Sequence, residues 1–89
     1  MQIRQRTNWV PGPDGDTLTR NDMPAPGTRR WGLRMKARVV AGVEGGLITL
    51  AEACAWYDLS AEEYLTWRNR TLKRDYPHLS WMQQAAKVR

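Results

Sequence analysis

The chain has 89 residues, with 14 Lys or Arg and 9 Asp or Glu, so its formal net charge is +5. This length allows one small domain, and the charge favours a nucleic acid or an acidic protein as partner. One Cys and one His exclude an intrachain disulfide and leave no evident metal site. No apolar run approaches the roughly 18 residues that span a bilayer, and the basic N-terminus lacks the apolar stretch of a signal peptide. We therefore expect a cytoplasmic protein without a membrane partner.

Residues 1–27 are expected to form an extended or flexible N-terminal arm. Proline and glycine recur through this segment and interrupt helices and ladders, and Pro13-Asp14-Gly15 is a turn signal. Two alternatives remain open for the arm. It is a mobile tail, or Trp9 or Leu18 pins part of it to the domain. The helical domain then covers residues 28–89.

The first helix is expected to begin after Thr28 and to end near residue 44, where Gly45-Gly46 supplies the usual C-terminal glycines. Apolar residues repeat at helical spacing within it, at Met35, Val39 and Val43. A parallel basic stripe lies one step round the helix, at Arg30, Arg34 and Arg38. The pattern predicts an amphipathic helix with a basic side.

The next stretch predicts two short helices joined by a tight turn. Thr49 followed by Glu52, and Ser60 followed by Glu63, are two capping boxes, in which a hydroxyl and a carboxylate each accept from backbone N–H groups. Asp58 lies between the two helices and tolerates a left-handed conformation. This is the outline of a helix-turn-helix, whose second helix usually enters a DNA groove.

Packing inside this motif is expected to depend on a few residues. Ala53 and Cys54 are small enough for a buried crossing of the helices, and Leu59 after the turn is expected to be buried. Tyr64 and Trp67 are the inward positions of the second helix. That helix is expected to reach about residue 74 or 75, and a short final helix from Trp81 to Val88 is expected after Ser80.

Catalysis is not expected. No phosphate-cradling glycine loop follows a strand, and the one histidine, His78, has no evident nucleophile or second base beside it. The adjacent Glu62 and Glu63 point about 100° apart on a helix, which does not make a catalytic pair. We therefore expect no catalytic residue, no cofactor and no small-molecule substrate.

The helix-turn-helix prediction defines an exposed face on the second helix. The candidates for base reading are Ala61, Glu62, Leu65, Thr66 and Asn69. Asn69 suits adenine, Glu62 suits cytosine N4, and Leu65 suits the thymine methyl group. The candidates for phosphate contact are Arg34, Arg38, Ser60, Arg68, Arg70, Lys73 and Arg74. Such contacts position the protein on DNA and set the salt dependence of binding.

A second function stays open, because the motif itself is acidic. Between Thr49 and Trp67 there is no Lys or Arg, and the second helix opens with two glutamates that repel phosphates. The chain would then be a purely protein-binding module that docks on a DNA-bound regulator without reading bases. Its interface candidates are Trp56 and Leu65, although Trp56 could instead be a shelf for the tail. The basic residues could also be an ordinary solvated surface.

The residues also resemble a known family, the small CtrA-inhibitory proteins (SciP-like), which are cell-cycle transcription regulators of alpha-proteobacteria. The resemblance covers about residues 12–67 and fades beyond Trp67. In the first part the matching residues are Gly12-Pro13-Asp14-Gly15, Leu18-Thr19, Asp22, Pro24, Pro26, Thr28 and Arg30-Trp31. In the second part they are Lys36-Ala37, Val39-Val40, Val43, Gly45-Gly46-Leu47, Glu52-Ala53-Cys54, Tyr57, Leu59-Ser60, Glu63 and Trp67.

The resemblance implies a helical domain with a Trp-repressor-like helix-turn-helix. It further implies repression of genes that the response regulator CtrA activates, by contact with CtrA at promoters and by direct DNA binding. The expectation is therefore an all-α domain behind a Pro/Gly-rich arm, acting as a nucleoid-associated transcriptional regulator. Its expected partners are promoter DNA and a CtrA-like response regulator.

Overall fold

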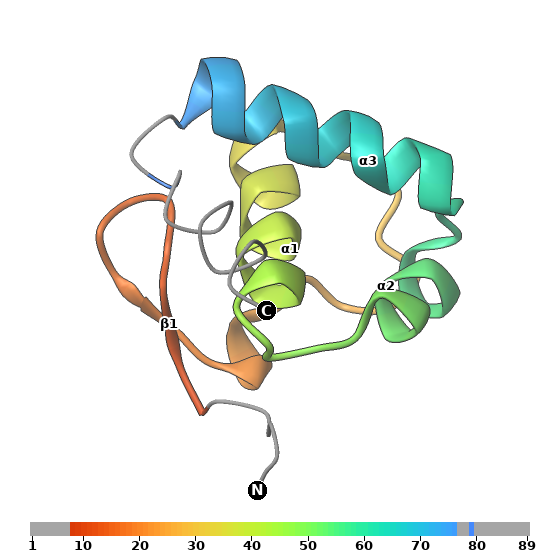
Figure 1. The fold of residues 1–89 in the computed structure, drawn as a ribbon. Helices are drawn as coiled ribbons and strands as arrows, with labels where there is room; N and C mark the ends of the chain where they lie inside the picture. Colours follow the sequence, from red (N-terminus) through yellow and green to blue (C-terminus); the bar gives the residue numbers. More distant parts are fainter. Residues whose placement is uncertain (1–7, 77–78, 80–89) are drawn as a thin grey trace, which may run out of the picture.

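The computed structural model describes residues 8–76 and Leu79, and it is mostly helical (Figure 1). Its helices are α1 (Leu33–Glu44), α2 (Leu50–Tyr57) and α3 (Ala61–Arg70). The last helix continues directly into a π-helical turn, η2 (Thr71–Asp75). Figure 1 shows α3 lying across one end of α1, with α2 below the start of α3. α1 contacts α2, α3, η2 and the first strand of the N-terminal segment, so it is the centre of the fold.

The N-terminal segment forms a small antiparallel sheet, which corrects the all-α prediction. β1 (Val10–Pro11) pairs with β2 (Thr17–Leu18), and a 3₁₀ turn, η1 (Arg20–Asp22), follows. The predicted turn at Pro13-Asp14-Gly15 joins the strands, with Gly15 at φ 82°. Strands of two residues are too short to show an alternating pattern, so the sequence reveals the turn and not the sheet.

Part of the expected arm is core. Val10 and Leu18 are 3% and 1% exposed, and both belong to the same hydrophobic cluster as α1 and α3. Of the two residues expected to pin the arm, Leu18 is buried, whereas Trp9 is 56% exposed. Met23 also packs there, because Gly42 of α1 leaves room for it. A Cβ at Gly42 would lie only 2.6 Å from the Met23 sulfur.

The first helix begins later than expected, at Leu33 with Gly32 as its cap. Thr28 does not cap it, since its hydroxyl donates to the Ala25 carbonyl (2.6 Å) and its N–H closes the same turn. The chain then runs extended to Gly32. The predicted end is confirmed, with Gly45 as the C-cap and Gly46 at φ 91°.

The extended segment before α1 carries Trp31 into a cluster of rings. Trp31 lies 5.2 Å from Tyr57 in an edge-on arrangement and 4.9 Å from Trp67, measured between ring centroids. Trp31 and Trp67 are half-buried at the margin of the core. Cys54, expected to be buried, is half-buried. The small residue of α2 that is fully buried is its neighbour Ala53.

The expected length of the second motif helix is confirmed, since helical turns run from Ala61 to Asp75. The expected final helix, Trp81 to Val88, lies outside the described residues. Within the part of the chain that the structure describes, no helix has the length and apolarity that membrane crossing requires.

Candidate nucleic-acid interface

The two capping boxes and the turn have the predicted geometry. Glu52 N–H donates to the Thr49 hydroxyl (3.0 Å), and Thr49 N–H donates to the Glu52 carboxylate (2.9 Å). Ser60 and Glu63 repeat the arrangement, at 3.0 and 3.1 Å. Asp58 has φ 53° and ψ 53°, the left-handed conformation expected of it. α3 therefore starts at a fixed angle to α2, with its first turn capped.

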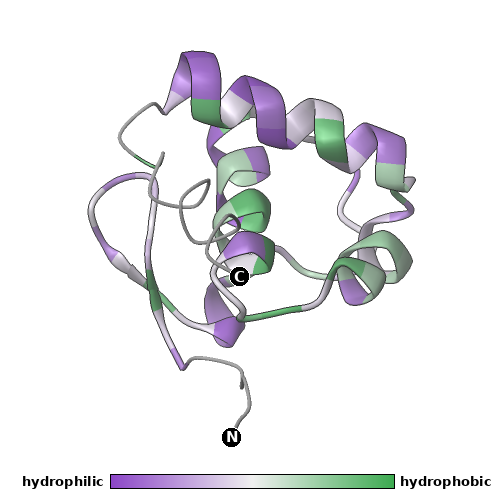
Figure 2. Ribbon diagram, in the orientation of Figure 1, coloured by the Kyte–Doolittle hydropathy of each residue, from purple (hydrophilic) through white to green (hydrophobic). Residues whose placement is uncertain are grey.

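All five base-reading candidates are exposed on α3: Ala61, Glu62, Leu65, Thr66 and Asn69. At 3.6 residues per turn they span an arc of about 140°, so they form one continuous face. Leu65 is 51% exposed, and the Thr66 hydroxyl donates to the Glu62 carbonyl (3.1 Å). Figure 2 shows hydrophilic residues predominating along α3, while apolar residues predominate on α2.

The phosphate candidates divide into paired and unpaired residues. Four are held by carboxylates of the same chain, in the pairs Arg34–Asp14 (3.2 Å), Arg38–Asp16 (4.0 Å), Arg68–Glu44 (3.2 Å) and Arg70–Asp75 (3.3 Å). Ser60 accepts from the Glu63 N–H as a cap. Lys73 and Arg74 are exposed and have no ion-pair partner among the described residues.

Arg68 is the clearest departure from the phosphate prediction. Its side chain is only 20% exposed, and it lies between α3 and α1, where it binds the Glu44 carboxylate. The Tyr64 hydroxyl donates to the other oxygen of Glu44 (2.7 Å). Burial, and then the hydrogen bond to Glu44, raise the pKa of Tyr64 above its usual 10.0. Arg68 therefore completes a half-buried network and is poorly placed for a phosphate.

Trp56 is not the exposed anchor that the protein-binding prediction needs. It is half-buried against the core, and the Arg20 guanidinium lies 5.1 Å from its ring centroid. Its carbonyl accepts from the Gly27 N–H (2.8 Å), so the N-terminal segment rests on it. The alternative prediction is a shelf for the tail, and Trp56 instead contacts Arg20 and Gly27 of the N-terminal segment. The shelf carries the N-terminal segment that sequence patterns treat as an arm.

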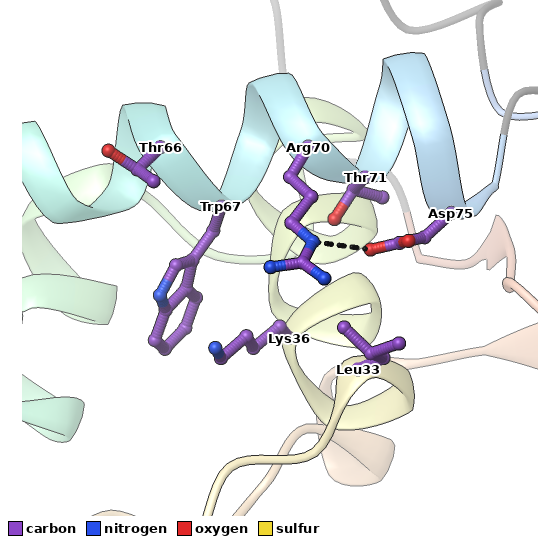
Figure 3. A pocket seen from close by; sticks show the side chains of 7 residues that line it. All are labelled: Leu33, Lys36, Thr66, Trp67, Arg70, Thr71 and Asp75. Carbon is purple, nitrogen blue, oxygen red and sulfur yellow. Dashed lines mark ion pairs between the residues drawn. The ribbon is translucent and has the colours of Figure 1, made fainter.

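A small pocket beside α3 brings two predicted site residues, Thr66 and Arg70, together with residues for which the sequence predicts no function. Its volume is about 120 Å3, and it lies between the start of α1 and the end of α3 (Figure 3). Its lining residues are Leu33, Lys36, Thr66, Trp67, Arg70, Thr71 and Asp75. The Lys36 ammonium lies 5.5 Å from the Trp67 ring centroid. Spacing alone does not show this cation–aromatic contact, which joins two helices.

The described residues contain no group of three His, Cys, Asp or Glu side chains that could hold a metal ion. Arg29 lines a shallow hollow with Trp31, Tyr57 and Asp58, next to the turn before α3. The first turn of α3 carries the acidic Glu62 and Glu63, whereas its last turn carries Arg68 and Arg70. The positive charge of the unit thus lies mainly at the end of α3.

Comparison with known proteins places the chain among uncharacterised relatives. A family model described as "Protein of unknown function (DUF1153)" matches residues 2–83. A solution NMR structure of a Rhodobacter sphaeroides protein is similar, with 35% identity, a TM-score of 0.70, and coverage of 96% of this chain and 92% of that chain. A second structural-genomics target solved by NMR has 38% identity, a TM-score of 0.59, and coverage of 99% and 94%. No curated protein matches the chain.

Proposed function

The chain belongs to the DUF1153 family of proteins of unknown function, and we propose that it is a transcriptional regulator that binds promoter DNA. In this proposal α2 and α3 form a helix-turn-helix, and α3 is the helix that faces the groove. The observation that carries it is the left-handed turn at Asp58 between two capped helices, with the outer face of α3 left exposed. Such a turn fixes the second helix on the first while leaving its outer side free.

Base reading is assigned to the exposed face of α3. Asn69 lies at its centre and carries the amide that suits adenine, while Thr66 and Leu65 flank it. Glu62 opens the helix, and its carboxylate can accept a hydrogen bond from a cytosine amino group. The same negative charge repels phosphates. The basic end of α3 is therefore the part expected to lie closest to the DNA backbone.

Phosphate contact is assigned first to Lys73 and Arg74, which have no ion-pair partner among the described residues. Arg34 and Arg38 serve only if they leave Asp14 and Asp16. Exposed ion pairs of this kind contribute about 0–1 kcal/mol, so a phosphate can replace the carboxylate at little cost. Arg68 is left out of this assignment, because it is half-buried and bound to Glu44.

The resemblance to the small CtrA-inhibitory proteins supports a finer proposal. The regulator would act at promoters bound by a CtrA-like response regulator, and it would be associated with the nucleoid. A second candidate function, docking on that regulator without base reading, is supported by Leu65. Its side chain is 51% exposed on the same face, as an apolar anchor of a protein interface would be.

Substitution of Asn69 by Ala tests the DNA proposal. Asn69→Ala should lose about 1–3 kcal/mol of discrimination at one base position, because the amide reads one base. The measurement is fluorescence anisotropy against a panel of promoter duplexes with single base changes. Asn21→Ala, at an exposed position in η1, is the matched control. An unchanged base preference in Asn69→Ala would refute base reading by this residue.

The Leu65→Ala variant tests the second candidate function. It is titrated with the response regulator in the presence and in the absence of promoter DNA. If Leu65→Ala weakens only the binding of the regulator while Asn69→Ala changes nothing, the protein-docking function holds and the base-reading function fails.

A further inference from the structure

The pocket between α1 and α3 brings together two cations from different helices. Lys36 comes from α1 and Arg70 from α3, and Figure 3 shows both side chains extending into the space between the helices, with Trp67 beside Lys36. Leu33, which is 46% exposed, forms the opposite wall. A surface of this kind offers positive charge above apolar walls.

The charges in the pocket are only partly neutralised. Arg70 uses its Nε to bind Asp75 (3.3 Å), which leaves its two terminal nitrogens without a described partner. Lys36 has no carboxylate partner among the described residues, and its ammonium lies over the Trp67 ring. Two cations and one carboxylate give the pocket a net charge of +1. It therefore suits a single, singly charged anion.

The π-helical turn fixes this arrangement. Tyr76 N–H donates to the Thr71 carbonyl (2.8 Å), five residues back. The wider turn places Asp75 beside Arg70. Asp75 and Thr71 both line the pocket. Turns of this type are rare and occur frequently at functional sites. The carboxylate thus orients the Arg70 guanidinium toward the pocket.

The size and chemistry of the pocket favour a phosphodiester. A volume of about 120 Å3 holds one small group, since a cavity of ~150 Å3 binds benzene and drug-sized ligands need ~300 Å3 or more. A planar carboxylate binds best to the fork of one arginine, whereas the free donors here come from two side chains on different helices, Lys36 of α1 and Arg70 of α3. These two donors suit the two free oxygens of a tetrahedral phosphodiester.

We propose that this pocket binds one phosphodiester group of the DNA backbone between Lys36 and Arg70, with Leu33 and Trp67 against the adjoining sugar. Thr66 belongs both to the pocket and to the base-reading face, so a phosphate there would fix α3 in register with the bases. The DNA role rests on the proposed function, and it adds Lys36 of α1 to the binding surface.

The salt dependence of DNA binding tests whether the two cations share one phosphate. Each phosphate neutralised contributes about 0.9 to the slope of log K against log salt. Lys36→Gln and Arg70→Gln should each weaken binding, and the double variant should lower the slope by about 0.9 in total. The control double variant, Lys73→Gln with Arg74→Gln, should lower it by about 1.8, because two separate phosphate contacts are lost. The proposal is overturned if Lys36→Gln leaves DNA affinity unchanged. It is also overturned if the double variant Lys36→Gln with Arg70→Gln lowers the slope by about 1.8, as the loss of two separate phosphates would.

A second experiment does not depend on promoter binding. Dimethyl phosphate, a free phosphodiester, is titrated into the full chain while the Trp67 indole N–H signal is followed by NMR, with acetate as the comparison. Dimethyl phosphate should shift the signal, and Lys36→Gln should abolish the shift. A shift with acetate alone would assign the pocket to a carboxylate of a protein partner, and no shift with either would remove the site. If the site binds dimethyl phosphate but the chain binds no DNA, the proposed function fails and the phosphodiester site stands.

Discussion

Tyr64 of α3 binds Glu44 of α1 beside the Arg68–Glu44 ion pair, which joins the same two helices. Its ring is 2% exposed, and its hydroxyl donates to Glu44, which also binds Arg68. A buried hydrogen bond to a charged group contributes more than a neutral one, about 1.5–3 kcal/mol. The network therefore fixes the crossing of the two helices, and with it the direction of the α3 face.

Replacing Tyr64 by Phe should destabilise the protein by about 1–3 kcal/mol, because the Glu44 carboxylate loses a buried donor. Urea unfolding near neutral pH measures the change. Glu63→Gln, which keeps the cap oxygen on the outer side of α3, is a control expected to remain within about 0.5 kcal/mol of the wild type. A Tyr64→Phe variant as stable as the wild type would show that the network adds no stability.

Alkaline pH offers a second measurement on the same residue. Burial and the Glu44 contact raise the folded pKa of Tyr64 above 10.0, and burial also raises the pKa of Tyr57. The unfolded state then releases these protons first as pH rises, so the stabilising effect is complete below pH 10 and is lost above it. The free energy of unfolding should fall above pH 10.0, and less steeply in Tyr64→Phe. An equal slope in both proteins would contradict the assignment.

Residues with local partners were predictable, and residues with distant partners were not. Thr49 and Ser60 have their partners three positions away, so the sequence shows both caps. Arg34 binds Asp14, 20 positions back, and no periodic pattern links a helix to a hairpin tip. For the same reason the sequence makes Arg68 a phosphate candidate, since no local pattern shows Glu44 beside it.

The turn between α2 and α3 determines how the α3 face is presented. Asp58 occupies the left-handed region at a cost of roughly 1–2 kcal/mol for a residue with a Cβ, part of which the short polar side chain offsets. Leu59 N–H donates to the Cys54 carbonyl (3.1 Å) across the turn, and Leu59 itself is buried. The whole element thus depends on one backbone conformation.

Two substitutions at Asp58 should separate conformation from side-chain chemistry. Asp58→Gly should fold with stability within about 1 kcal/mol of the wild type, because glycine adopts a positive φ freely. Asp58→Val should lose about 1–2 kcal/mol or more, since a β-branched residue is an outlier there. Thermal unfolding followed by circular dichroism measures both. Equal stability of the two variants would mean that the turn does not need a left-handed residue.

At the level of elements, the sequence predicts the helices better than their beginnings. α2 and α3 start where their capping boxes are, and α1 ends where its glycines are. The start of α1 was misplaced because Thr28 resembles a cap, whereas its partners lie in the preceding turn. The hairpin and the π-helical turn have no sequence signature of their own. The pocket depends on the π-helical turn, so it was not predictable either.

The whole molecule is built around a core that includes its N-terminal segment. Val10, Leu18 and Met23 pack on α1, and Arg20 binds Glu52 of α2 through two hydrogen bonds (2.8 and 3.2 Å). The helices of so short a chain bury little surface by themselves. The segment that composition suggests is a tail therefore supplies part of the stability of the helical unit.

Truncation of Leu18 should show this contribution. Leu18→Ala should cost about 2–5 kcal/mol, because it removes a fully buried side chain and leaves a cavity. Trp9→Ala is the control within the same segment, and with Trp9 56% exposed it should change stability little. Chemical denaturation of both variants measures the difference. A Leu18→Ala variant as stable as Trp9→Ala would show that the N-terminal segment is not part of the cooperative unit.

Charge is distributed unevenly over the molecule. The first turn of α3 carries Glu62 and Glu63, whereas its end and η2 carry Arg70, Lys73 and Arg74. The proposed DNA binding would therefore use the basic end of α3 and η2, with Lys36 of α1 beside it. Arg29 and Arg30 provide a charge-matched comparison, since both are exposed and lie before α1, outside α3 and η2.

The most direct test of DNA binding through α3 is a titration of promoter DNA at several salt concentrations. Compared with the wild type, Lys73→Gln with Arg74→Gln should lower the slope of log K against log salt by about 1.8, because two phosphate contacts are lost. Arg29→Gln with Arg30→Gln removes the same charge and should lower it less. Equal losses in the two double variants, or no binding of DNA by the wild type, would contradict the account.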